Sequence, residues 1–231
     1  MTSRKIEYWV IPPEADGEFA AAMEDVLDVY SRPYDPQRPV LNMDEQPVQL
    51  LKETRVPIAA TASHPRRVDY EYERAGTANI FMFCEPLAGW RDVAVREQKT
   101  KLDWAEEIAR LLEGRYAHCE QVLLVCDNLN THTRSAFYER FPAARARELV
   151  RRLEFHYTPK HGSWLNIAEN ELSSLTRQCV SGRRFPDIAT LRTETSAWAT
   201  HVNEGQRGVD WQLKIDDART KLKSIYPKII D

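Results

Sequence analysis

Three acidic residues stand where a fold of strands and helices would bring carboxylates together. Asp44 follows the apolar run 40–43, Asp127 follows the most apolar run of the chain, 122–126, and Glu169 lies on a predicted helix. Ligands of open α/β sheets gather beyond the strand ends. We therefore expect two carboxylates at neighbouring strand ends and a third that reaches them from a helix.

Three carboxylates in close contact repel one another unless a divalent cation lies between them. Hard oxygen ligands suit Mg²⁺, for which Mn²⁺ can substitute. Two such ions ~3.5–4 Å apart can activate an attacking oxygen and stabilise a leaving oxygen in phosphodiester displacement. The pattern therefore predicts that Asp44, Asp127 and Glu169 are metal ligands and catalytic residues of a two-metal centre.

Other interpretations of these acids stay open. An aspartate just past a strand is often a turn former or a helix cap, and Asp44 could pair with a nearby lysine. Glu171 rivals Glu169 as the third acid, because both border the apolar stripe of the same predicted helix. Helical periodicity does not choose between them.

Charge is unevenly distributed along the chain. The whole sequence has 32 basic and 35 acidic residues, a net charge of -3. Residues 1–120 carry 15 basic and 22 acidic residues, whereas 121–231 carry 17 and 13. A local positive field attracts phosphates even when the whole protein is acidic, although a solvated helix face would show the same composition.

Cysteine and hydropathy patterns exclude several classes of protein. The four cysteines form no Cys-x-x-Cys pair, and no His/Cys group has zinc-site spacing. We expect buried, reduced thiols. No apolar run approaches the ~18 residues of a membrane span, and no signal peptide is recognisable. These features predict a cytoplasmic protein with no membrane partner.

The hydrophobic pattern predicts an α/β fold with a mixed sheet. A hairpin followed by strands that are linked through helices is typical of an RNase-H-like core. A leading helix should precede this sheet, and a helical tail should follow it. The predicted helices are 12–30, 102–112, 133–141, 143–153, 163–180 capped by Ser163, one from about 187, and 217–225; the predicted strands are 40–44, 79–84, 90–95, 122–126 and 154–157, with 53–77 as a loop or ragged hairpin.

Three local strings resemble one known family. They are Asp44-Glu45 after an apolar strand, Asp127-Asn128 followed by His132, and the run 159–169, which ends in Leu165-Asn166-x-x-Glu169. They are similar to the DDE transposases of the mariner superfamily, specifically the bacterial insertion sequence 630 group. The resemblance covers about residues 9–227.

The resemblance implies a catalytic activity. Asp44, Asp127 and Glu169 would hold the catalytic metals in an RNase-H-like core. Water would nick DNA at the element ends, and the freed 3′-hydroxyl would attack target DNA. The partners would be DNA and a second copy of the chain, with no small organic cofactor, and the bacterial protein would associate with the nucleoid when bound to DNA.

Residues near the acids are candidates for supporting roles. Asn128 could steady Asp127 or simply cap the next helix. His132 could touch phosphate or an acid beside the metal ligands, or it could cap a helix. Lys160 and His161 lie in the loop before the helix of Glu169, where cations meet phosphates first. Three arginines could extend this DNA-binding track along the same helix: Arg177, Arg183 and Arg184.

The predicted organisation has three parts. Residues 1–38 form a leading helix and a proline-rich linker, 39–185 the catalytic core, and 186–231 a helical extension. Members of the resembled family usually carry N-terminal helix-turn-helix domains, and no such module is recognisable here. Two alternatives therefore stay open: an RNase-H-like nuclease without strand transfer, or an idle fragment that binds DNA or intact transposase.

Overall fold

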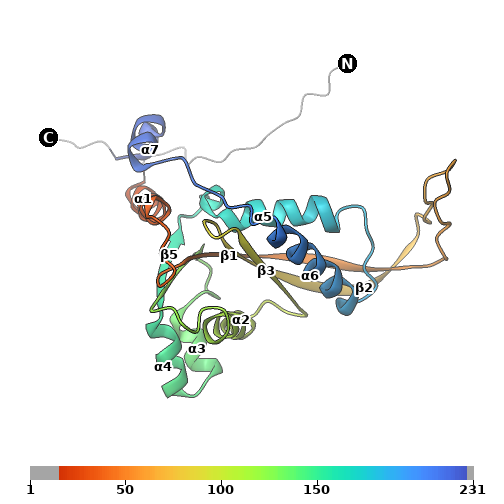
Figure 1. Cartoon of the computed structure of the whole chain (residues 1–231), viewed down its shortest axis with the longest axis horizontal. Coiled ribbons are helices and arrows are strands. Elements are labelled where there is room, and N and C mark those ends of the chain that lie inside the picture. Colours follow the sequence, from red (N-terminus) through yellow and green to blue (C-terminus); the bar gives the residue numbers. More distant parts are fainter. Residues whose placement is uncertain (1–15, 228–231) are drawn as a thin grey trace.

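A single five-stranded sheet organises the chain. The computed structural model describes residues 16–227, and its strands lie in the order β3-β2-β1-β4-β5 (Figure 1). β1 pairs in parallel with β4, and β4 with β5, whereas β1–β2 and β2–β3 are antiparallel. The predicted mixed sheet is confirmed. The strands are β1 Val40–Glu53, β2 Tyr72–Glu85, β3 Trp90–Arg96, β4 Val122–Asp127 and β5 Leu153–Thr158.

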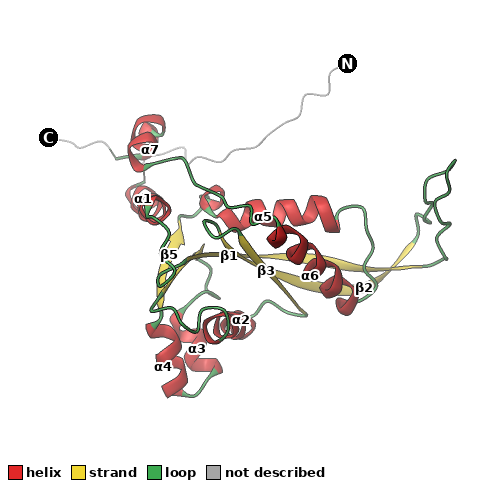
Figure 2. Cartoon of the chain, viewed as in Figure 1, coloured by secondary structure: helices red, strands yellow, loops and turns green. Residues whose placement is uncertain are grey.

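Seven α-helices accompany the sheet within the described residues (Figure 2). Short 3-10 turns at Ser163–Leu165 and Lys223–Ile225 and a π-helical turn at Thr176–Val180 complete the regular structure. The α-helices are α1 Gly17–Ser31, α2 Lys101–Glu113, α3 Arg134–Arg140, α4 Ala143–Arg151, α5 Ile167–Leu175, α6 Ile188–Glu204 and α7 Ile215–Lys221.

The sheet separates two hydrophobic cores. The helices α1, α5 and α6 pack on one face, and α2, α3 and α4 pack on the other (Figure 1). Alternate residues of β4 point to opposite cores: Leu123 and Val125 join the α5 side, and Leu124 and Cys126 join the α2 side. Burial on both faces explains why this strand is an unbroken apolar run.

Strands β1 and β2 are much longer than predicted. β1 continues nine residues past Asp44, and β2 begins at Tyr72, so only 54–71 lie between them. The expectation of a loop over 53–77 is therefore wrong at both ends. In β1, Val48 and Leu50 are buried while Pro47 and Gln49 are exposed, which is the alternation of a strand with one covered face.

The leading helix belongs to the main core. α1 begins at Gly17, where the Asp16 side chain accepts from the amides of Glu18 and Phe19. The predicted start at Pro12 lies outside the described residues. The side chains of the predicted apolar stripe are all buried, and they share a core with α5 and α6; they are Phe19, Met23, Val26 and Tyr30. This core spans all three predicted parts of the chain and therefore does not mark boundaries between them. The three-part division stays a prediction.

Two further sequence expectations can be compared with the described residues. All four cysteines are buried and unpaired, as expected. Within residues 16–227, no helix has both the length and the apolarity needed to cross a lipid bilayer.

Candidate functional site

Asp44 and Asp127 occupy equivalent positions on neighbouring strands. Asn42 of β1 lies opposite Val125 of β4 in the parallel register, and each aspartate follows two residues later. Successive side chains alternate between the faces of a sheet, so each aspartate projects on the same side as the residue two positions before it. Val125 belongs to the core under α5. Both aspartates therefore face the layer that carries Glu169.

Glu169 lies in the first turn of α5, and it borders the same cavity as Asp44. This cavity has a volume of about 570 Å³ and is open to solvent on one side; its other lining residues are Glu45, Gln46, Leu172, Ser173, Thr176 and Arg177. The helix N-terminus is a favourable place for a carboxylate, because the helix dipole is positive there.

The electrostatics of Asp44 show that the three acids influence one another. Burial is the largest influence on Asp44, and together with the negative charges of Glu169 and Asp127 it raises the pKa of Asp44 to about 7, against a backbone hydrogen bond that lowers it. Burial and the charge of Asp127 also raise the pKa of Glu169, while a hydrogen bond from Ser163 opposes that rise. Within residues 16–227, the Asp44 carboxylate makes no ion pair, and the hydrogen bond recorded for it comes from the adjacent amide of Glu45 at 2.8 Å.

This donor set suits a hard divalent cation. A half-buried carboxylate without a cationic partner, next to two further carboxylates, is stabilised when a cation enters. No group of three or more His, Cys, Asp or Glu side chains in the described part of the chain is already gathered closely enough to hold a metal. Mutual repulsion of uncompensated anions is the physical reason to expect such a spread arrangement.

His132 connects the first two acidic motifs. Its ring is fully buried; Nε2 lies 2.8 Å from Oε1 of Glu45, and Nδ1 lies 2.6 Å from Oδ1 of Asp127. The Asp127 oxygen makes no hydrogen bond of good geometry, so the second contact is mainly ionic. Burial alone would lower the pKa of His132, but its contacts with Asp127, Cys126 and Glu45 raise that pKa to about 12. The imidazolium therefore lies between two carboxylates, and it does not cap a helix.

Asn166 fixes the helix that carries Glu169. Its side-chain oxygen accepts from the amide of Ala168 at 3.1 Å, and Nδ2 donates to the carbonyl of Met43 at 2.9 Å. One side chain thus caps α5 and ties its first turn to the residue before Asp44. The expectation that Ser163 caps this helix is wrong, because Ser163 begins a separate 3-10 turn. The spacing from Asn166 to Glu169 is that of a capping residue and its third helical position, and this was the missed signal.

Glu171 is committed to another contact. Its Oε1 accepts from Nη2 of Arg91 at 2.7 Å, and both side chains are nearly buried. It lines a different cleft from the one shared by Asp44 and Glu169. The burial of Glu171 is explained by this ion pair with β3.

The candidate DNA-binding cations fall into two groups. Lys160, His161 and Arg177 are exposed, and none forms an ion pair within residues 16–227. Arg183 pairs with Glu194 at 2.9 Å. Arg184 is only 17% exposed and binds Glu53 at 2.6 Å as well as three backbone carbonyls of 69–71. Its guanidinium anchors the β1–β2 hairpin, so a continuous track through Arg184 would require these contacts to break.

Asn128 is exposed on the loop after β4, and its side chain makes no hydrogen bond within the described part of the chain. Thr133 holds the N-cap position of α3 instead. The expectation that Asn128 caps the next helix is therefore wrong.

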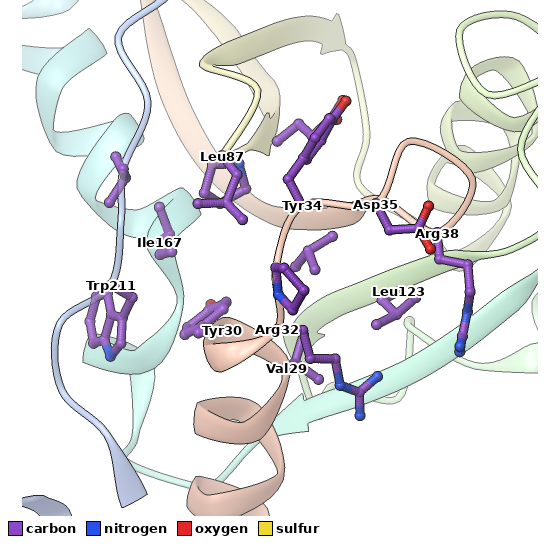
Figure 3. Close-up of a pocket in the computed structure, with 15 residues that line it drawn as sticks. Val29, Tyr30, Arg32, Tyr34, Asp35, Arg38, Leu87, Leu123, Ile167 and Trp211 are labelled. Carbon is purple, nitrogen blue, oxygen red and sulfur yellow. The ribbon is translucent and has the colours of Figure 1, made fainter.

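An apolar cavity of about 230 Å³ lies at the opposite ends of the parallel strands (Figure 3). Tyr30 and Trp211 form one wall, and Leu123 of β4 contributes to its lining. None of the three acids borders it, so it is separate from the candidate site.

A family model described as "DDE superfamily endonuclease" matches residues 39–192, more than half of the chain. The chain belongs to the DDE superfamily of endonucleases. This match contains all three candidate acids. No curated protein matches the chain.

Solved structures with the same fold extend the comparison of this DDE endonuclease. The Mos1 mariner paired end complex with Mn has a TM-score of 0.54 at 14% identity, covering 87% of this chain and 60% of that chain. The Mos1 strand transfer complex gives 0.55 at 14%, covering 86% and 59%. The Mos1 catalytic domain gives 0.50 at 11%, covering 83% and 85%. At these identities the matches establish the RNase-H-like transposase fold, and the chain spans about 60% of the length of the Mos1 chains in the two complexes.

Proposed function

We propose that this DDE endonuclease is the catalytic domain of a transposase that cleaves DNA at transposon ends and joins the 3′-hydroxyl to target DNA. The observation that carries the proposal is the placement of Asp44 and Asp127 at equivalent positions of adjacent parallel strands, on the side where Glu169 begins α5. Family membership and the Mos1 fold match support it.

Asp44, Asp127 and Glu169 would hold the metal ions, Mg²⁺ or Mn²⁺ and two in number. When bound, such ions supply Lewis-acid activation of the attacking oxygen and stabilisation of the leaving oxygen. The protein's own contribution is orientation. Asn166 holds α5 against β1, and the His132 imidazolium bridges Glu45 and Asp127. Lys160, His161 and Arg177 offer exposed cations or hydrogen-bond donors to the DNA backbone.

Several finer assignments belong to this proposal. They are membership of the insertion sequence 630 group, a bacterial origin with nucleoid association, and a homodimer in the DNA complex. Two of the matched structures are the Mos1 paired end complex and the Mos1 strand transfer complex, and this supports DNA ends as the substrate here.

The test is a nicking and strand transfer assay with Mg²⁺ or Mn²⁺ on DNA that carries the element ends. Asp44→Asn, Asp127→Asn and Glu169→Gln should each reduce cleavage by at least about 100-fold, because each removes a metal ligand. Full activity in both Asp127→Asn and Glu169→Gln would refute the assignment. Preferential cleavage of an RNA–DNA hybrid would instead favour a ribonuclease, and tight binding of intact transposase without cleavage would favour an idle fragment.

A further inference from the structure

A polar cleft lies on the flank of α5 that faces away from Asp44. It has a volume of about 860 Å³ and runs between α5 and the C-terminal end of α6. Figure 1 shows these two helices side by side over the same face of the sheet. The side chains that matter for its chemistry are Asn170, Ser174, Arg177, Gln178, His201 and Arg207.

This cleft presents mainly hydrogen-bond donors. Arg177 and Arg207 are exposed, and neither guanidinium forms an ion pair within residues 16–227. Gln178 accepts from the indole of Trp198 through Oε1 at 2.7 Å, so its amide NH₂ group remains to donate. Guanidinium, amide and hydroxyl donors together are the groups that contact phosphate oxygens along nucleic acid backbones.

The acids of the cleft do not cancel this character. Glu171 is neutralised by Arg91 at 2.7 Å. Glu204 is 72% exposed and lies 3.8 Å from His201, at the rim. Two arginines therefore carry charge that no carboxylate in the described residues pairs with.

Several arginines of the opposite layer are paired: Arg96, Arg110, Arg140 and Arg145 all lie at ion-pair distance from carboxylates. Arg147 of α4 is exposed and unpaired within the described residues, so a single unpaired arginine does not mark a surface. The α5–α6 cleft differs in that two such arginines line the same space.

Arg177 connects the cleft with the candidate site. It lines both the cleft and the cavity that contains Asp44 and Glu169, because α5 separates the two spaces and Arg177 lies in the π-helical turn at its end. A DNA strand that extends from the carboxylates past Arg177 would enter the cleft, and its phosphates would reach Arg207.

We propose that the cleft between α5 and the end of α6 binds the phosphate backbone of the DNA strand on one side of the reacting phosphodiester. This inference rests on the proposed function for its choice of DNA, and it adds a binding subsite with Arg207 as its distinguishing residue.

The experiment measures binding of a fluorescein-labelled DNA duplex by anisotropy, with the full chain and without divalent ions. Arg207→Glu and Ser174→Asp place negative charge in the cleft. Arg147→Glu is the matched control, because Arg147 is also exposed and unpaired within the described residues but lies on α4 in the opposite layer. Thermal unfolding of each variant checks that it is folded; within residues 16–227 the Arg207 side chain makes no hydrogen bond or ion pair that its replacement would remove.

Arg207→Glu should weaken DNA binding by about 5- to 10-fold at low salt and reduce the slope of log affinity against log salt by about 1. Ser174→Asp should weaken it in the same direction, and Arg147→Glu should change it by less than about 2-fold. Equal effects of Arg207→Glu and Arg147→Glu, or no DNA binding by the parent chain, would overturn the proposal. Cleavage of DNA by the parent chain is measured separately with Mn²⁺. If the parent chain cleaves DNA but Arg207→Glu binds DNA as tightly as the parent chain does, the cleft proposal fails and the proposed function stands. DNA binding that depends on Arg207 without any metal-dependent cleavage overturns the proposed function and leaves the cleft.

Discussion

Nε2 of His132 lies 2.8 Å from Oε1 of Glu45. Glu45 directly follows Asp44, and His132 lies five positions after Asp127, so this contact joins the two acidic motifs. Glu45 and His132 are 87 positions apart in the chain, yet they share one buried ion pair. Since the ring also contacts Asp127, His132 holds the loop after β4 against the middle of β1.

Replacing His132 should destabilise the fold. His132→Ala leaves Glu45, whose side chain is 5% exposed, without its cationic partner. Loss of one partner from a buried pair costs about 3–5 kcal/mol, so we expect a fall of about 3 kcal/mol in the free energy of unfolding, measured with urea. In a Glu45→Gln background the cost of His132→Ala should shrink by about 1 kcal/mol or more. Additive costs within about 0.5 kcal/mol would contradict the ion pair.

Glu169→Gln and Glu171→Gln form a matched pair with opposite expected effects. Glu169→Gln removes a carboxylate that two neighbouring acids repel, so cleavage should be lost while stability is kept or slightly raised. Glu171→Gln leaves the Arg91 guanidinium buried without its counter-charge, so stability should fall by about 2–3 kcal/mol while Mn²⁺ affinity is kept. Metal titration and urea unfolding of both variants make the test. Loss of Mn²⁺ affinity in Glu171→Gln with none in Glu169→Gln would reverse the assignment.

This pair also shows a limit of inference from sequence. Both glutamates border the apolar stripe of α5, so periodicity could not separate them. What separates them is Arg91 on β3, 80 positions away from Glu171, and a contact of that range has no local signal. The buried strand Val122–Asp127 was predictable, because an unbroken apolar run is typical of a strand that is covered on both faces.

The length of β1 was predictable in part. Val48 and Leu50 alternate with exposed neighbours, but Pro47 argues against a strand when only sequence is available. The register explains how the proline is accommodated: β1 pairs with β4 only over Val40–Asn42, so its later residues have no strand on that side. Edge positions of this kind tolerate proline.

Asn166 should affect both stability and metal binding. Asn166→Ala removes the cap of α5 and the hydrogen bond to Met43, which should cost about 1–2 kcal/mol of unfolding free energy. Asn166→Asp keeps the cap acceptor but places a second acceptor against the Met43 carbonyl, so its stability cost should be at least as large, and Mn²⁺ affinity should fall. Equal Mn²⁺ affinity of Asn166→Asp and the parent chain would show that the link to β1 does not position Glu169.

The docking of the tail should depend on pH through Glu24. A hydrogen bond from Arg219 is the largest influence on Glu24 and lowers its pKa below the ordinary 4.5, joined by one from Tyr226. The stabilisation is present above the ordinary pKa and is lost as the pH falls through the lower pKa of the folded state. The protection factors of the α7 amides, which correct for the slower intrinsic exchange in acid, should therefore fall in the parent chain as the pH drops below about 4.5. Glu24→Gln should show lower protection factors already at neutral pH and a smaller further decrease in acid; a pH response equal to that of the parent would contradict this role.

The most direct test of the central claim is anomalous scattering from a crystal of the full chain soaked with Mn²⁺. The account predicts density for Mn²⁺ within about 2.2 Å of carboxylate oxygens from Asp44, Asp127 and Glu169, with Glu171 still bound to Arg91. Mn²⁺ held by Glu171 or by residues outside this set, or no Mn²⁺ between the three acids at saturating concentration, would contradict it.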